Sequence, residues 1–132
     1  MKTAKGGKVV LDASAILALL IGEPGAEAVR EHIPDSVASA VNVAEVAAKL
    51  ADHGVKDSEI REIIGALGIE VAPCDADLAF ASATLRRQSR KAGLSLGDRM
   101  CLALARLRDL PALTADKRWL DLDLGVEIRS IR

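Results

Sequence analysis

The chain has 132 residues, half of them apolar, a formal charge of -1 and a pI near 6.1. This length supports one globular domain with a sizeable core, so we expect a single domain over residues 1–132. The charge balance argues against binding nucleic acid by bulk positive charge, and with only Phe80 and Trp119 as aromatics, a surface that stacks successive bases is excluded.

Short apolar runs alternate with helical repeats along the whole chain. The pattern predicts, in chain order, a strand near residues 8–12, helices near 14–22 and 24–32, a weaker strand near 36–39, helices near 41–53 and 57–67, a strand near 69–72, long helices near 76–92 and 97–108, a strand near 111–115 and an edge strand near 126–130. Strands separated by helices imply an α/β fold, with a parallel sheet covered on both faces.

The helix near 97–108 carries two local signals. Its apolar residues Met100, Ala103, Leu104 and Leu107 follow the spacing of one buried helix face. Ser95, followed three residues later by an acid, has the form of a capping box that starts this helix.

Asp12 is the most informative single residue, because it follows the apolar run Val9 to Leu11 and precedes a nearly all-apolar helix. An ionised carboxylate without a partner costs several kcal/mol in such surroundings. Ligands of open parallel sheets bind at the carboxyl ends of strands, where both Asp12 and Asp116 are expected. Glu45 and Asp98 lie in the first turns of helices and can reach the same edge.

Each acid also has a purely structural interpretation. Asp98 fits the acidic member of the capping box, Glu45 can pair with Lys49 one helical turn on, and Asp116 can be a turn residue with surface partners. Asp12 can face the dipole at the start of its helix.

Taken together, the four acids predict a bound cation. If their oxygens gather about 5 Å apart, six repulsive pairs of about 3 kcal/mol each exceed the roughly 5–15 kcal/mol of stability available to a domain. Such a cluster must hold protons or a cation, and oxygen-only ligands favour Mg²⁺ or Mn²⁺. The two cysteines form no CxxC pair and have no histidine at zinc-ligand spacing, which is typical of a reduced, cytoplasmic protein.

Three smaller polar residues lie close to these acids in sequence. Ser14 and Thr114 are each two residues from an acid, where a hydroxyl can orient a metal-bound water or can simply serve helix capping and strand propensity. Asn42 is either the N-cap of its helix or an amide that supports Glu45.

A basic segment, "LRRQSRK", ends the helix that precedes this capping box. Its cations are Arg86, Arg87, Arg90 and Lys91. They can form a solvated helix face, where positive charge suits the helix C-terminus. Alternatively, they can form a row of RNA phosphate contacts that leads to the acidic edge.

Two apolar helices suggest protein partners. The helix near 14–22 and the segment Ile60 to Leu67 are apolar on much of their circumference, which fits either a subunit interface or burial between neighbouring helices. The N-terminal lysines and Ala26-Glu27-Ala28 imitate a signal peptide, but Asp12 interrupts the apolar run, so we expect a cytoplasmic protein without a membrane span.

Four segments in order resemble the PIN-domain nucleases, and specifically the VapC-type toxins of type II toxin–antitoxin pairs. These segments are "VVLDASAIL", "ASAVNVAEV", "LSLGDRMCLALA" and "LTADKRWL", and they span nearly the whole chain. The resemblance implies a three-layer α/β/α fold with a central parallel sheet of four to five strands.

The same resemblance implies endoribonuclease activity that depends on Mg²⁺ or Mn²⁺. It assigns the catalytic and metal-binding positions to Asp12, Glu45, Asp98 and Asp116, with Ser14 and Thr114 as supporting hydroxyls and Asp121 and Asp123 close to the fourth position. It also implies an RNA substrate, a cognate antitoxin and a homodimer.

Two other functions stay open. A non-catalytic member of the same fold would act as an RNA-binding or assembly module. A phosphotransfer domain of the dehalogenase-like or receiver type also places an aspartate after its first strand, but Ser14 stands where the dehalogenase-like motif needs its second aspartate.

Overall fold

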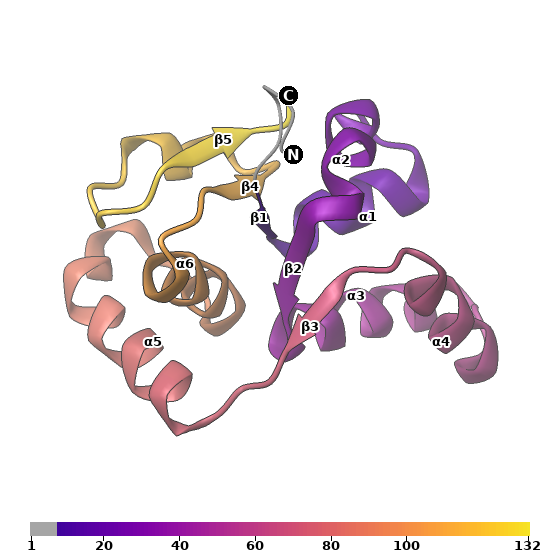
Figure 1. Cartoon of the computed structure of the whole chain (residues 1–132), viewed down its shortest axis with the longest axis horizontal. Coiled ribbons are helices and arrows are strands. Elements are labelled where there is room, and N and C mark those ends of the chain that lie inside the picture. Colours follow the sequence, from indigo (N-terminus) through magenta and orange to yellow (C-terminus); the bar gives the residue numbers. More distant parts are fainter. Residues whose placement is uncertain (1–7) are drawn as a thin grey trace.

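The computed structural model describes residues 8–132, so Lys2 and Lys5 of the N-terminal basic segment lie outside the described residues. Five parallel strands form one sheet in the order β3-β2-β1-β4-β5 (Figure 1). Their bounds are Val9–Leu11 (β1), Ser36–Ser39 (β2), Glu70–Ala72 (β3), Ala112–Thr114 (β4) and Ile128–Ser130 (β5). Val10 aligns with Val37 of β2 on one side and with Ala112 of β4 on the other, which places β1 at the centre of the sheet.

Helices cover both faces of this sheet (Figure 1). The α-helices are Ala13–Ile21 (α1), Ala26–His32 (α2), Ala40–Asp52 (α3), Asp57–Ala66 (α4), Ala76–Gln88 (α5) and Leu96–Arg108 (α6). Three short 3-10 helices are Ile33–Asp35 (η1), Arg90–Ala92 (η2) and Lys117–Asp121 (η3). The expected three-layer α/β/α fold with four to five parallel strands is confirmed.

Two hydrophobic cores result from the alternation of side chains along each strand. Val10 and Val37 point into the core beneath α5 and α6. Val9 and Leu11, on the opposite face of β1, point into the core beneath α1 to α4. The continuous apolar run of β1 is therefore buried on both faces, as is typical of a parallel sheet.

The structure differs from the sequence prediction in several details. The helix expected near 76–92 ends at Gln88, and η2 continues it as a 3-10 turn. Residues 117–121, for which no element was predicted, form η3. Helix α6 is buried all round from Arg99 to Ala105 because α5 and the sheet enclose it, whereas Leu107 of the predicted buried face is 57% exposed.

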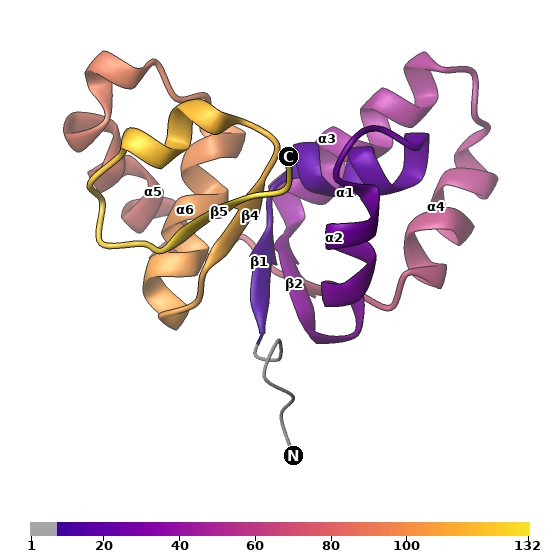
Figure 2. The same cartoon turned by 90° about the horizontal axis from the view of Figure 1, so that it is seen from above.

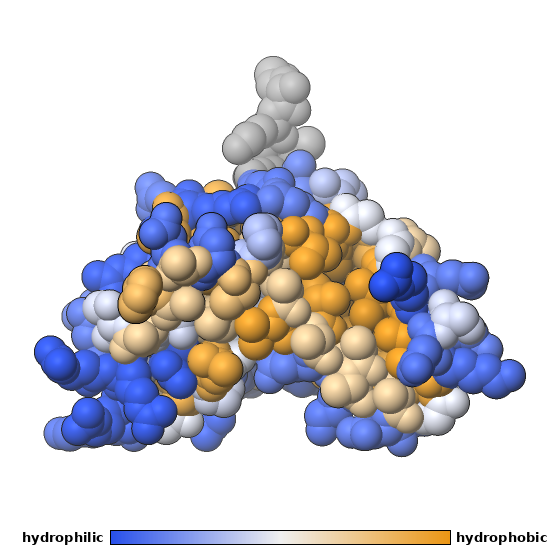
Figure 3. All heavy atoms as spheres, turned by 90° about the horizontal axis from the view of Figure 1, so that it is seen from below, coloured by the Kyte–Doolittle hydropathy of each residue, from blue (hydrophilic) through white to orange (hydrophobic). Residues whose placement is uncertain are grey.

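Within residues 8–132, no helix has the length and apolar character that crossing a membrane requires. The indigo strand β1 in Figure 2 points toward the edge at which α1 begins. Figure 3, seen from the opposite side, shows the outline of the molecule indented at this edge.

Candidate active site

The strand order places a topological switch point at the centre of the sheet. The chain proceeds from β1 outward to β2 and β3, then crosses to the other side of β1 to form β4 and β5. Open α/β sheets bind ligands outside the carboxyl ends of the strands at such a point. Asp12 follows β1 and Thr114 ends β4, so these two residues flank the switch point.

Asp12 is buried at this position, with only 5% of its surface exposed. It occupies the N-cap position of α1, but its side chain makes no capping hydrogen bond there. Its Oδ2 instead accepts hydrogen bonds from the hydroxyls of Ser14 at 2.7 Å and Thr114 at 3.0 Å. Both supporting hydroxyls predicted from the sequence therefore contact the same carboxylate oxygen.

The two hydroxyls are themselves held in place. The hydroxyl oxygens of Ser14 and Thr114 lie 3.3 Å apart and share a hydrogen bond. The Ser14 hydroxyl also accepts a hydrogen bond from the backbone N–H of Ala115. Thr114 accepts one from the backbone N–H of Asp116. The carboxyl ends of β1 and β4 are thus connected by one polar network around Asp12.

Burial raises the pKa of Asp12 to about 6, and the negative charge of Asp98 adds to this rise, although the hydrogen bonds from Ser14 and Thr114 oppose it. The acid is therefore short of compensating positive charge. Desolvation is the main cause, which is the physical signature of a carboxylate in a functional site.

Glu45 is positioned by a buried amide. Asn42, fully buried in α3, donates one amide hydrogen to Glu45 Oε1 and the other to the carbonyl of Gly97, both at 3.0 Å. Ser39 is the N-cap of α3, so the N-cap alternative for Asn42 is wrong, whereas its contact with Glu45 is the one that the supporting-amide alternative predicts. The alternative pairing of Glu45 with Lys49 is not among the ion pairs of the described residues.

Gly97 is a contributor that the sequence did not reveal. A Cβ atom at this position would overlap the carboxylate of Glu45, so any larger residue here would displace that carboxylate from its present position. The contact joins residues 52 positions apart, and local patterns carry no signal for it.

Asp98 forms the predicted capping box with Ser95: its carboxylate accepts from the Ser95 backbone N–H at 2.9 Å. Its negative charge also acts on Asp12, whose pKa it raises. The charges of Asp12, Asp98 and Glu45, together with burial as the main cause, raise the pKa of the Cys101 thiol. Asp98 therefore combines its structural role with a position among the acids.

Asp116 is held by Arg118, which contacts both of its carboxylate oxygens. These hydrogen bonds are the main reason that the pKa of Asp116 lies below its usual value. The negative charge of Asp98 contributes to the raised pKa of Arg118. Because Arg118 binds Asp116, Asp116 lies on the same edge as Asp98. Asp121 and Asp123, the neighbouring acids, line a different pocket beside the end of α5.

The four acids do not form the compact cluster considered from the sequence, in which their oxygens gather about 5 Å apart. Among residues 8–132, no three histidine, cysteine or acidic side chains are grouped as ligands for one metal ion. The physical reason is local: Asp98 and Asp116 are each held by donors of their own segments. Asp12 and Glu45 are left facing the edge as an open, partly preorganised set of hard oxygen donors.

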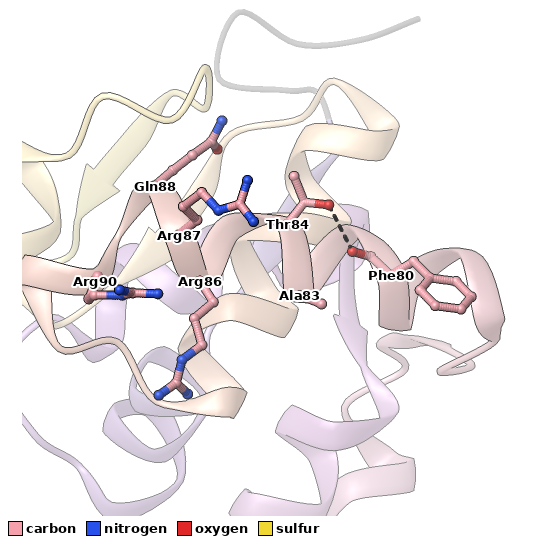
Figure 4. A pocket seen from close by; sticks show the side chains of 7 residues that line it. All are labelled: Phe80, Ala83, Thr84, Arg86, Arg87, Gln88 and Arg90. Carbon is pink, nitrogen blue, oxygen red and sulfur yellow. Dashed lines mark hydrogen bonds between the residues drawn. The ribbon is translucent and has the colours of Figure 1, made fainter.

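The basic residues at the end of α5 are exposed and line two adjoining pockets. Arg86, Arg87 and Arg90 line a groove along α5 together with Phe80 and Thr84 (Figure 4). Lys91 contributes to the neighbouring pocket that contains Asp121. None of these four cations forms an ion pair with a carboxylate within the described part of the chain.

These features define a PIN domain: an acid at the end of the central strand of a parallel α/β/α sheet, with further acids from two helices and the next strand. The PIN domain family model matches residues 9–124, so the chain belongs to this family. The phosphotransfer alternative is therefore not supported.

Among its relatives are the VapC ribonuclease Mb2780c of Mycobacterium bovis and the ribonuclease VapC42 of Mycobacterium tuberculosis. Each is 32% identical over 115 residues, which cover 80% of this chain and 88% of the relative. The fold is also that of a toxin-antitoxin complex from Klebsiella pneumoniae, with a TM-score of 0.74, 22% identity and coverage of 94% of this chain and 98% of that one.

Proposed function

We propose that this chain is a ribonuclease that hydrolyses phosphodiester bonds within RNA and depends on Mg²⁺ or Mn²⁺. The observation that carries the proposal is the buried carboxylate of Asp12 at the switch point, where burial raises its pKa to about 6 and the charge of Asp98 adds to the rise. The names of the 32% identical relatives support the same activity.

A divalent ion suits these residues, because all the donors are carboxylate oxygens and Asp12 lacks compensating positive charge. Asp12 and Glu45 would hold it, and Asp98 and Asp116 would join them by exchanging their present donors, the Ser95 N–H and Arg118, for the ion. When bound, such an ion lowers the pKa of a water molecule and stabilises negative charge on a phosphate.

The chain's own residues supply orientation. Ser14 and Thr114 fix one oxygen of Asp12, and Asn42 fixes one oxygen of Glu45, so both carboxylates enter the reaction with restricted rotamers. Preorganised groups of this kind save the reorganisation that would otherwise be needed in the transition state.

The test is Asp98→Asn, which keeps the shape of the side chain and an oxygen for the Ser95 N–H. The variant should retain the wild-type circular dichroism spectrum and lose Mg²⁺-dependent cleavage of RNA. Asp52→Asn, the same change at an exposed acid in the last turn of α3, away from both the acidic edge and the basic end of α5, is the matched control and should cleave normally. Full activity of Asp98→Asn would remove Asp98 from the mechanism.

The non-catalytic alternative is favoured by one observation, the engagement of Asp98 and Asp116 by local donors. A binding or assembly module would bind RNA equally well with and without Mg²⁺ and release no new RNA ends. Sequencing of RNA ends after expression of the wild type and of Asp12→Ala separates the two functions.

We further propose that the basic end of α5 binds the RNA backbone. Arg86, Arg87, Arg90 and Lys91 have no carboxylate partners within residues 8–132, so their charges are available to phosphates. Neutralising phosphates releases counterions, so the affinity should fall steeply with salt.

The proposed biological role is that of a cytoplasmic toxin neutralised by a cognate antitoxin. The Klebsiella pneumoniae neighbour is titled a toxin-antitoxin complex, which supports a partner of this kind. Expression should arrest growth, Asp12→Ala should not, and co-expression of the protein encoded next to the gene should restore growth.

An apolar groove of about 660 Å³ between α3 and α4 offers a surface for such a partner. Val43, Ala47, Ile60 and Ile64 contribute to it, and Figure 3 shows the apolar surface that extends over this side of the molecule. Contiguous exposed apolar surface of this kind is typical of interaction sites. Light scattering of the protein alone and with its antitoxin tests the expected homodimer separately from antitoxin binding.

A further inference from the structure

Arg99 is a charged side chain buried in the first turn of α6, with only 9% of its surface exposed. A guanidinium has five N–H donors. Nη1 donates to the carbonyl of Ser82 at a long 3.4 Å, and Nε has no partner in the part of the chain that the structure describes. A buried charge with an unpartnered donor is costly, so this arrangement points to a ligand.

Arg99 lines a pocket of about 250 Å³ between α5, η2 and the start of α6. The residues around the pocket are Arg86, Ser89, Arg90, Gly93, Leu94 and Arg99. Figure 4 shows Arg86 pointing away from Arg87 and Gln88.

The pocket therefore gathers three guanidinium groups and no carboxylate. Neither Arg86, Arg90 nor Arg99 belongs to an ion pair among residues 8–132. Like charges brought together repel one another, whereas an anion between them is attracted by all three.

The chemistry of the lining identifies the class of anion. Guanidinium groups match the oxygens of phosphate with paired hydrogen bonds. No aromatic side chain lines the pocket, so it offers no platform for a base. A phosphate group fits these donors, and a nucleobase does not.

We propose that Arg86, Arg90 and Arg99 bind a backbone phosphate of the RNA other than the scissile one. This inference rests on the proposed ribonuclease function. Arg99 directly follows Asp98 in α6, so a phosphate bound at the pocket would constrain where the RNA strand lies relative to that carboxylate. Such a contact positions the RNA independently of its sequence.

The experiment measures binding of a short single-stranded RNA at several salt concentrations in EDTA, where cleavage is absent. Arg86→Gln and Arg90→Gln should each weaken binding about tenfold, and the two changes combined should lower the slope of log affinity against log salt by about 0.7, the contribution of the one phosphate that they share. Arg61→Gln, the same change on exposed α4, should leave both unchanged. In Mg²⁺, the two pocket variants should raise KM with little change in kcat.

Arg99 itself is tested first in the wild-type protein, whose fold is unchanged. The ¹⁵N–¹H resonance of its Nε should shift when RNA is added to the wild-type protein, and Arg99→Lys should bind RNA less tightly because the planar fork is lost. A purely structural Arg99 would give no shift of this resonance.

The outcomes distinguish this inference from the proposed function. Normal binding and cleavage by both pocket variants, with an unshifted Arg99 resonance, overturns the pocket and leaves the nuclease standing. RNA binding that depends on the pocket, in a wild-type protein that does not cleave, overturns the nuclease and supports the pocket. A shift on addition of inorganic phosphate or an antitoxin peptide, but not RNA, overturns the RNA assignment.

Discussion

Replacing Asp12 by asparagine should stabilise the metal-free protein at neutral pH. The pKa of Asp12 is about 6 in the folded protein, against 3.8 as its ordinary value. The folded state therefore binds more protons than the unfolded state between these values, so the free energy of unfolding falls as the pH rises through this window. The difference of about 2 pKa units corresponds to about 3 kcal/mol.

Asparagine is neutral throughout and lacks this pH dependence. The stability of Asp12→Asn relative to the wild type should increase by about 2 kcal/mol between about pH 4.5 and about pH 7.5. The measurement is urea unfolding in EDTA at several pH values, read by circular dichroism. Asp123→Asn, an exposed acid, serves as the control and should follow the wild-type profile.

A pH-independent difference between Asp12→Asn and the wild type would refute the reasoning, because it would mean that Asp12 carries no buried, uncompensated charge. The effect of added Mg²⁺ on the unfolding midpoint is a second test for the charge of Asp12. It should raise the wild-type unfolding midpoint at neutral pH and leave that of Asp12→Asn nearly unchanged.

Three further changes probe the supporting contacts. Gly97→Ala should displace the Glu45 carboxylate and reduce Mg²⁺-dependent cleavage, with a thermal midpoint close to that of the wild type, since alanine favours the helix by about 1 kcal/mol. Asn42→Ala should cost about 1–3 kcal/mol in urea unfolding, because it leaves the Gly97 carbonyl and the Glu45 carboxylate without their donor. Glu70, whose pKa is lowered to about 2 chiefly by hydrogen bonds from Arg108, is largely solvated, so Glu70→Gln should cost less than about 1 kcal/mol. That cost should be present above about pH 4.5, vanish as the pH falls toward 2, and shrink in high salt.

The sequence predicted the features that depend on neighbours along the chain. The apolar run before Asp12 identified β1, and the Ser95 and Asp98 spacing identified the start of α6, because capping and periodicity are local. The position of Asp12 at the edge followed from a general rule about parallel sheets.

Contacts between distant segments were beyond the reach of the sequence. The fit of Gly97 against Glu45 and the burial of Arg99 each depend on how α6 packs against α3 and α5. Leu107 was wrongly placed in the core for the same reason, since the last turn of α6 extends past the elements that cover its centre.

Asp12 and Arg99 are buried charges of opposite sign, yet they do not pair with each other in the described residues. A fold optimised for stability alone would bring such groups together or replace them with apolar side chains. Each is held apart in its own polar setting, Asp12 by two hydroxyls and Arg99 beside two further arginines. The separation is explained if each awaits a ligand of opposite charge, a divalent cation at one site and a phosphate at the other. RNA with its bound metal ions supplies both, so the substrate would neutralise in one complex the two charges that the free protein leaves unpaired.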